Sequence, residues 1–310
     1  MAHIGILTQS GDLHAELAAH WVEQAGGRAS LIYADRVPQS GGISWASSAP
    51  DRARLDAADG PISPDQLDVL WWRRVGRPTV PDAVSDPAAR TVVANEARDA
   101  VLGCLRAGFR GRWVSDPDAT RRAELKLVQL RAALRVGLRV PRTLVSQIPS
   151  DIREFCAELG GRMVVKPVAS TMDIPLRAGV LTEDTLPADR ELALVPAIYQ
   201  ELVPGDVHLR ACTWGSTVVV GTISSDLMDW RTDVAPRVGT GQLGGGTAAQ
   251  LTALNAHLGL AMGISDLKPA PDGGPPYWLE VNPQGQFLFL EGLGGPEVAR
   301  SFARFLLDCA

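Results

Sequence analysis

The sequence predicts a mixed α/β (α+β) fold, and three of its features support that prediction. The chain starts with a short apolar run, a turn and an amphipathic helical pattern, which together form a βα unit. Apolar runs and helical patterns then alternate along the sequence. Near the C-terminus, two short apolar strands flank a turn rich in proline and glycine. The 310 residues suffice for one large domain or for two to three small ones.

The first hundred residues are expected to form an open α/β layer. Residues 3–7 are typical of a strand, and Asp12 is placed to cap a helix over about 13–25. One face of this helix is apolar and consists of Leu13, Leu17, Trp21 and Ala25. Residues 29–35 predict the next strand, whereas the abundance of proline, glycine and serine over 37–64 indicates loops.

The middle of the chain predicts further alternation. The segment DVLWWRRVGRP begins with a strand, and residues 90–106 show a helical pattern. The next helix is expected to stop at Gly137 and to present the apolar residues Leu127, Leu130 and Leu134. Asp151 and Glu154 have the spacing of a capping pair for the helix that follows.

The C-terminal half predicts mainly strands. Apolar runs indicate them in RMVVKPV, ALVPAIYQELV, HLRACTWGSTVVVGTISS, ISDL and YWLEVN. Thr247 and Gln250 have capping-box spacing at the start of a helix. The last helix presents an apolar face of Val298, Phe302, Phe305 and Leu306.

Composition narrows the classes of function. Hydrophobic residues make up 45% of the chain and charged residues 21%, which is typical of a globular protein. No apolar stretch approaches the roughly 20 residues of a membrane span, and the net charge of −5 does not suggest a nucleic-acid partner. The N-terminus lacks the basic and apolar regions of a secretory signal. The four cysteines lie far apart, so we expect reduced thiols in a cytoplasmic protein.

The segment YWLEVNPQGQ carries a pattern that suits a metal ion. In a strand, Glu280 and Asn282 point to the same face. The residues of the opposite face, expected in the core, are Tyr277, Leu279 and Val281. A carboxylate beside an amide oxygen suits Mg²⁺, and Asp266 on the preceding strand could add a second carboxylate. A solvated strand face is the alternative, but the apolar neighbours favour the metal site.

Lysine is rare, since only three of the 30 basic residues are lysines: Lys126, Lys166 and Lys268. Lys166 has apolar neighbours in VVKPV, and a buried ammonium group needs an anionic partner such as a nucleotide phosphate. Lys126 lies among leucines on a predicted helix, where a surface lysine with its stem on the apolar face is the alternative.

Two further segments are ambiguous when taken alone. YQELVPGDVHLR has the pattern of a hinge whose backbone could pair with an adenine edge, or of an ordinary strand–turn–strand. In the sequence Asp229-Trp230-Arg231, the arginine could bind phosphate or carboxylate oxygens, or could stack on the tryptophan at the surface. Arg73 and Arg74 are open to the same two interpretations.

Other motifs of enzymes are weak or lacking in the sequence. Residues 239–244, GTGQLG, match G-x-G-x-x-G, but the segment before them is a poor strand, so we favour a glycine-rich loop over a ligand. The sequence has no Walker A motif, no HExxH and no GxSxG, and its five histidines lack metal-binding spacing. A zinc enzyme and a serine hydrolase are therefore not supported.

Taken in order, these segments resemble the ATP-grasp carboxylate–amine ligases, and more closely the graspetide synthetases of the microviridin type. The segment DLKPAPDGGPPYWLEVNPQGQF is the most specific, because its E-x-N-P followed by Gly-Gln and an aromatic is close to the family signature. The other matching segments are LTQSGDLHAE, VLWWRRVGRP, EARDAVLGCL, WVSDPDATRRAELKLVQLRAALRVGLRVPRTLVS, VVKP, YQELVPGDVHLRACTWG and DWR. The stretch Ser170–Asp173 and residues 239–246 are less typical of the family.

The resemblance implies an ATP-grasp fold of three parts. These are a Rossmann-like pre-ATP-grasp domain over 1–113, a central lid subdomain over 114–198 and a C-terminal subdomain with the metal site over 199–310. The implied ATP-binding residues are Lys126, Lys166, Gln200, Glu201, Leu202 and Val203. The implied Mg²⁺ ligands are Asp266, Glu280 and Asn282, and the implied contacts to phosphate or acyl-phosphate are Arg210 and Arg231. Relatives carry an acidic ribose contact where this chain has His208, and Asp206 could substitute for it.

The activity implied by the resemblance is activation of Asp or Glu side chains of a ribosomal precursor peptide by ATP. Attack by an amine or hydroxyl would then form amide or ester macrocycles, so the resemblance implies ATP, Mg²⁺, a precursor with leader and core, and a homodimer. A ligase that joins small molecules shares every residue named above. A non-catalytic nucleotide-binding protein is a third possibility, which the intact lysines and acidic set argue against.

Overall fold

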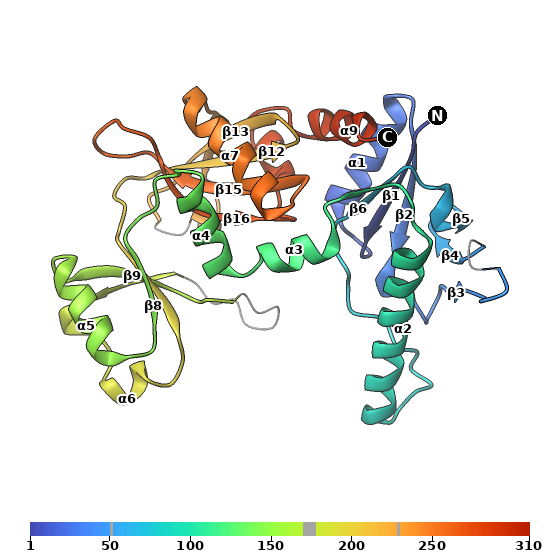
Figure 1. Cartoon of the computed structure of the whole chain (residues 1–310), viewed down its shortest axis with the longest axis horizontal. Helices are drawn as coiled ribbons and strands as arrows, with labels where there is room; N and C mark the ends of the chain where they lie inside the picture. The colour runs from blue at the N-terminus through green and yellow to red at the C-terminus, as the bar shows by residue number, and fades with distance from the viewer. Residues whose placement is uncertain (50–51, 170–177, 228–229) are drawn as a thin grey trace. The chain divides into compact units, whose positions relative to one another are not determined.

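The computed structural model describes residues 1–49, 52–169, 178–227 and 230–310 (Figure 1). The chain forms two compact units. Unit 1 comprises Met1–Asp118, Leu260–Met262 and Glu297–Ala310, and unit 2 comprises Ala119–Gly259 and Gly263–Pro296. The three-part division inferred from the sequence stays a prediction. Within the described ranges, no helix is both long enough and apolar enough to cross a membrane.

Unit 1 is built on a parallel four-stranded sheet with the order β2-β1-β6-β7. Its strands are β1 (His3–Thr8), β2 (Arg28–Tyr33), β6 (Val69–Trp72) and β7 (Arg112–Val114). Its helices are α1 (Leu13–Gln24), α2 (Pro87–Gly108) and α9 (Ala299–Asp308). The C-terminal helix belongs to this unit because Phe302 packs edge-on against Trp71 of β6, with ring centroids 4.7 Å apart.

A second, antiparallel sheet in unit 1 differs from the sequence prediction. Residues 37–64, expected to be loops, contain β3 (Ile43–Ser44), β4 (Arg54–Ala57) and β5 (Gly60–Ile62). These strands are only two to four residues long, too short to show an alternating apolar pattern. Leu55 nevertheless belongs to the buried core of the unit.

Unit 2 contains a small antiparallel sheet with the order β10-β9-β11-β8. Its strands are β8 (Thr143–Ser146), β9 (Arg162–Lys166), β10 (Gly179–Thr182) and β11 (Ala197–Gln200). The short helices α5 (Pro149–Glu158) and α6 (Asp189–Leu192) share a hydrophobic core with this sheet. Ile152, Cys156 and Met163 are fully buried in that core.

The larger sheet of unit 2 has the order β14-β13-β12-β15-β16. Its strands are β12 (Val207–Trp214), β13 (Thr217–Ser224), β14 (Arg237–Thr240), β15 (Met262–Lys268) and β16 (Tyr277–Asn282). The helices of unit 2 besides α5 and α6 are α4 (Lys126–Arg135), α7 (Gly245–Leu258) and α8 (Leu288–Gly292). Helix α3 (Pro117–Ala123) leads from unit 1 into unit 2.

Several predicted elements are confirmed. Asp12 caps α1 by accepting a hydrogen bond from the amide of His14, and Gly137 ends α4 with φ of 78°. The segments ISDL and YWLEVN are antiparallel neighbours in the larger sheet. Segment 201–206 connects β11 of the small sheet to β12 of the larger one, as expected for a hinge between strands.

The predicted apolar faces of two helices are wrong. Leu13 and Leu17 of α1 are 71% and 37% exposed, and the buried face consists of Ala15, Ala18, Ala19 and Val22. In α4, Leu127 and Leu134 are exposed, and the buried residues are Gln129, Ala132 and Ala133. Small side chains allow close packing of a helix on its neighbours, so the more hydrophobic face is not the one buried here.

The predicted capping residues of two helices are also wrong. Asp151 lies in the first turn of α5, which follows Ile148 and starts with a proline. Helix α7 starts at Gly245, before Thr247. The side-chain amide of Gln250 does not close a capping box but donates to the carbonyl of Gly137 over 2.7 Å. The first two residues of the GTGQLG segment end β14, and residues 241–244 join β14 to α7.

Candidate active site

Two carboxylates face each other across the last two strands of the larger sheet. Asp266 of β15 is the register partner of Glu280 of β16, and Ile264 is the partner of Asn282. The register shifts after Asp266, so that Leu267 pairs with Trp278 and leaves Leu279 as the extra residue of a β-bulge. The bulge explains a prediction that is wrong: Leu279 is not in the core and lines the cavity with Glu280, whereas Trp278 is buried.

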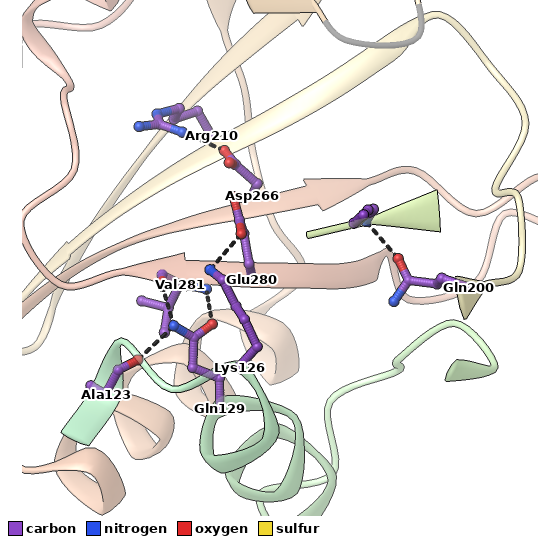
Figure 2. Close-up of polar contacts among 9 residues, drawn as sticks. Ala123, Lys126, Gln129, Gln200, Arg210, Asp266, Glu280 and Val281 are labelled. Carbon is purple, nitrogen blue, oxygen red and sulfur yellow. Dashed lines mark hydrogen bonds and ion pairs between the residues drawn. The ribbon is translucent and has the colours of Figure 1, made fainter. Parts of the chain in front are cut away.

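Each carboxylate has a cationic partner (Figure 2). The Nζ of Lys126, the first residue of α4, lies 2.7 Å from Oε2 of Glu280. The Nη1 of Arg210 on β12 lies 2.6 Å from Oδ1 of Asp266. Arg210 also donates two hydrogen bonds to the carbonyl of Gln286, through Nε at 3.1 Å and Nη2 at 2.7 Å. The positions of both acids are therefore fixed by charged partners from other elements.

Lys166 is held by the small sheet. It is the last residue of β9, and its Nζ donates to Oε1 of Gln200 at the end of β11 over 2.6 Å. The amide of Gln200 in turn donates to Oγ1 of Thr143 over 2.8 Å. Lys166 is the register partner of Ile198 in the antiparallel β9–β11 pair, and Gln200 lies two residues further along β11 on the same face, so the sheet makes the two side chains diagonal neighbours.

Gln129, which the sequence analysis did not identify, ties α4 to the metal-site strand. Its Nε2 donates to the carbonyl of Val281 over 2.8 Å and to that of Ala123 over 2.5 Å. Its Oε1 accepts the amide of Val281 over 3.2 Å. The side chain thus pairs with the free edge of β16 as a neighbouring strand would, and it does so one turn after Lys126 (Figure 2).

The charged groups of the site shift one another's pKa values. Burial raises the pKa of Glu280, but the charges of Lys126 and Lys166 outweigh burial and lower the pKa to about 2. Burial raises the pKa of Asp266, the attraction of Arg210 lowers it, and repulsion by Glu280 adds to the upward shift. Burial lowers the pKa of Lys166, and the negative charges of Glu280 and Asp266 act in the opposite direction. Glu280 is therefore ionised at neutral pH, and the group is typical of a functional site.

These side chains surround a cavity of about 180 Å³ in unit 2. Eight residues expected at the site line it: Lys126, Lys166, Gln200, His208, Arg231, Asp266, Glu280 and Asn282. Gln129, Leu130, Pro167, Ala178, Ile198, Trp230 and Leu279 complete the described lining. Arg210 reaches the site through Asp266.

Four residues expected at the site do not line this cavity. Glu201 pairs through its backbone and carboxylate with the backbone of Arg142, and Val203 is buried. Leu202 is half-buried, and Asp206 is exposed beyond Gly205. Asp229 and the stretch Ser170–Asp173 lie outside the described residues.

Among the described residues, no group of three His, Cys, Asp or Glu side chains is placed to hold a metal. The predicted set contains two carboxylates and one amide. That set fits Mg²⁺, which keeps several waters and shares its ligand sphere with phosphates, better than Zn²⁺, which takes nitrogen or sulfur ligands.

The architecture is that of the ATP-grasp ligases, which confirms the fold class predicted from the sequence. A scan of protein-family profiles and a search of curated proteins find no match. Solved structures with this fold include a Chryseobacterium gregarium RiPP-associated ATP-grasp ligase in complex with ADP and a leader and core peptide, with 20% identity, coverage of 100% of this chain and 98% of that chain, and a TM-score of 0.85. Macrocyclase MdnB from Microcystis aeruginosa MRC has 27% identity, 99% coverage of both chains and a TM-score of 0.80.

A third similar structure is the ATP-grasp ligase PsnB, complexed with a phosphomimetic variant of a minimal precursor, Mg and ADP. It has 21% identity, covers 100% of this chain and 99% of that chain, and has a TM-score of 0.79. Within the ATP-grasp fold, this chain is thus similar over its whole length to a RiPP-associated ligase, to a macrocyclase and to a ligase complexed with a minimal precursor. The resemblance inferred from the sequence is confirmed.

Proposed function

We propose that this chain is an ATP-dependent ligase that closes macrocycles in a ribosomal precursor peptide. The observation that carries the proposal is the Asp266–Glu280 pair at one cavity of an ATP-grasp fold. Arg210 pairs with Asp266, Lys126 pairs with Glu280, and Lys166 lines the same cavity. Ligases similar to this chain over its whole length are bound to precursor peptides and nucleotide, which supports the same substrate class here.

ATP is the energy source in this proposal. Lys166 and Lys126 hold its phosphates, because both ammonium groups border the cavity and a phosphate would replace the neutral amide of Gln200 as partner of Lys166. The backbone of Gln200–Val203 lines the adenine, and His208 with Asp206 lies toward the ribose. Of these residues, Gln200 and His208 border the cavity.

Asp266, Glu280 and Asn282 hold Mg²⁺ in this proposal. The fit rests on the donor set: two carboxylates in register on adjacent strands and an amide two residues further along the same face. Bound Mg²⁺ would neutralise part of the phosphate charge. Arg210 orients Asp266 through its 2.6 Å contact.

The chemistry needs no nucleophile from the protein. An oxygen of a substrate Asp or Glu carboxylate attacks the γ-phosphorus of ATP, the bond to the β–γ bridging oxygen breaks, and ADP leaves. An amine or hydroxyl of the peptide then attacks the acyl carbon, loses a proton and expels phosphate. The cationic side chains, Arg231 among them, stabilise the charge that develops on the transferred phosphoryl group.

We place the protein in the cytoplasm. All four cysteines are free thiols, and Cys104, Cys156 and Cys212 are buried without a partner cysteine. Free buried thiols are usual in a reducing compartment.

A homodimer completes the proposal, and α1 offers a surface for it. Leu13 and Leu17 are exposed. One turn further along α1, the guanidinium carbon of Arg300 lies over the ring of Trp21, 4.6 Å from the ring centroid. Helix α1 carries exposed acids and the contacting helix α9 carries exposed arginines, so this face supplies charges of both signs for a two-fold interface. Those residues are Glu16, Glu23, Arg300 and Arg304.

Light scattering after gel filtration tests the dimer. Leu17→Glu is expected to give a monomer, and Leu134→Glu, at an exposed leucine of α4, is expected to leave the dimer intact. A monomeric wild type, or a dimeric Leu17→Glu variant, would contradict this surface.

The ligase activity is tested by incubating the protein with ATP, Mg²⁺ and the candidate peptide encoded in its genomic neighbourhood. The expected result is loss of about 18 Da, one water, for each bond formed with one ADP released. An unchanged peptide, with ADP formed only when free amino acids or amines are added, would indicate a small-molecule ligase. No ADP under any of these conditions would indicate a non-catalytic nucleotide-binding protein.

A further inference from the structure

An acyl-phosphate exposes a ligase to a wasteful side reaction. Water can attack the same acyl carbon as the amine or hydroxyl, which returns the carboxylate, releases phosphate and consumes ATP without forming a bond. The cavity is lined mainly by charged and polar side chains, which attract water. A ligase of this kind therefore benefits from an apolar group that excludes water near its carboxylate pair.

Trp230 is the largest side chain among the described cavity-lining residues. It lies on a short turn, Trp230–Thr232, and is partly exposed. Its ring stacks on that of Phe289 from α8, with centroids 5.2 Å apart and planes inclined by 27°. An indole fixed in this way presents a rigid apolar surface.

Helix α8, which carries Phe289, is anchored in the core. Leu290, the neighbour of Phe289 on α8, is fully buried. It packs so tightly on β13 that a Cβ placed on Gly221 would lie 2.6 Å from its Cδ2. Phe287, just before the helix, is also fully buried and packs against Trp214 at 5.6 Å. Helix α8 is therefore anchored in the core through the residue after Phe289 and through Phe287 just before the helix.

The aromatic pair also covers the arginine that orients Asp266. The guanidinium carbon of Arg210 lies 5.8 Å from the ring centroids of both Trp230 and Phe289. The nitrogens of the same group donate to Asp266 and to the carbonyl of Gln286. The Arg210 side chain is 6% exposed, so the rings take the place of water around it. Arg210 therefore contacts both the aromatic pair Trp230–Phe289 and the carboxylate of Asp266.

We propose that Trp230, held by Phe289, is a positioning residue that excludes water from the activated carboxylate and so couples ATP cleavage to bond formation. The inference rests on the proposed ligase function. It assigns to Trp230 no role in binding ATP or in phosphoryl transfer. Loss of the indole is therefore expected to change the fate of the acyl-phosphate more than its formation.

The test measures ADP released and peptide bonds formed in the same reaction, with the peptide that the wild type modifies. The wild type is expected to release one ADP per bond. Trp230→Ala is expected to raise this ratio to about three or more while ADP release continues, because water then competes for the acyl carbon. Trp230→Phe is expected to keep a ratio near that of the wild type. Trp45→Ala, at an exposed tryptophan of unit 1, is the matched control and is expected to stay coupled.

A merely structural role for Trp230 gives a different result. Bond formation and ADP release would then fall in proportion, and an unchanged ratio in Trp230→Ala would overturn the inference. If that variant fails to fold, Phe289→Leu is measured in its place, with the same expected rise and the same contradicting outcome. A wild type that releases ADP but forms no bonds would instead overturn the proposed function, and the inference with it.

Discussion

Replacement of Gln129 by leucine is expected to damage both stability and the site. The amide of Gln129 makes three hydrogen bonds, two to the main chain of Val281 and one to the carbonyl of Ala123. Gln129 is 1% exposed, and Val281 and Ala123 are fully buried. Leucine would fill a similar volume but would leave three buried main-chain groups without these partners.

The expected loss follows from those three groups. A typical intramolecular hydrogen bond contributes about 1 kcal/mol net, and a buried group left unsatisfied costs about 1–3 kcal/mol. With partial relaxation and entry of water, we expect Gln129→Leu to lower the free energy of unfolding of unit 2 by about 3 kcal/mol. Because Val281 lies between Glu280 and Asn282, we also expect a lower turnover of ATP.

Urea unfolding followed by fluorescence, together with ADP release, measures both effects. Gln250→Leu is the matched control, since the side-chain amide of Gln250 makes one solvent-exposed hydrogen bond, to the carbonyl of Gly137. The control is expected to cost less than about 1 kcal/mol. A loss below about 1 kcal/mol for Gln129→Leu, or equal losses for the two variants, would refute the reasoning.

Three further predictions concern the site, the core of unit 1 and the thiols. Glu280→Gln and Lys166→Ala are each expected to abolish ATP turnover and to leave the circular dichroism spectrum unchanged; full activity in either variant would show that the site is wrongly assigned. Arg73→Met is expected to destabilise unit 1 by about 3–5 kcal/mol in thermal unfolding, because it leaves the buried carboxylate of Asp12, 3.1 Å from Nε of Arg73, without its cation; an unchanged melting temperature would count against this ion pair. Alkylation of the native protein at pH 8 is expected to modify Cys309 first and to spare Cys212, whose pKa burial raises to about 12; rapid labelling of Cys212 without denaturant would contradict its burial.

The order of elements and the centre of the site could be predicted from the sequence. Glu280 and Asn282 lie two residues apart in an apolar strand, a local pattern that needs no knowledge of the fold. Lys166 stood out because lysine is rare in this chain and its neighbours are apolar. Such signals are local in the sequence, and these residues do line one cavity.

The remaining features depend on partners far apart in the sequence. Gln129 is 152 residues from Val281, and nothing in the sequence around Gln129 points to that partner. The bulge at Leu279 depends on the register with β15, which the sequence of one strand does not reveal. Leucine spacing predicts the wrong buried face for α1, because the alanine face packs into the unit and leaves Leu13 and Leu17 exposed.

Transfer of a labelled oxygen tests the central claim most directly. The candidate peptide, carrying ¹⁸O in its Asp and Glu carboxylates, would be incubated with the protein, ATP and Mg²⁺, and the released phosphate would be analysed by mass spectrometry. If an acyl-phosphate forms, each bond closed transfers one carboxylate oxygen to phosphate, and the phosphate mass rises by about 2 Da. Closure of bonds with unlabelled phosphate would contradict activation of the carboxylate by ATP, and with it the role given to the Asp266–Glu280 site.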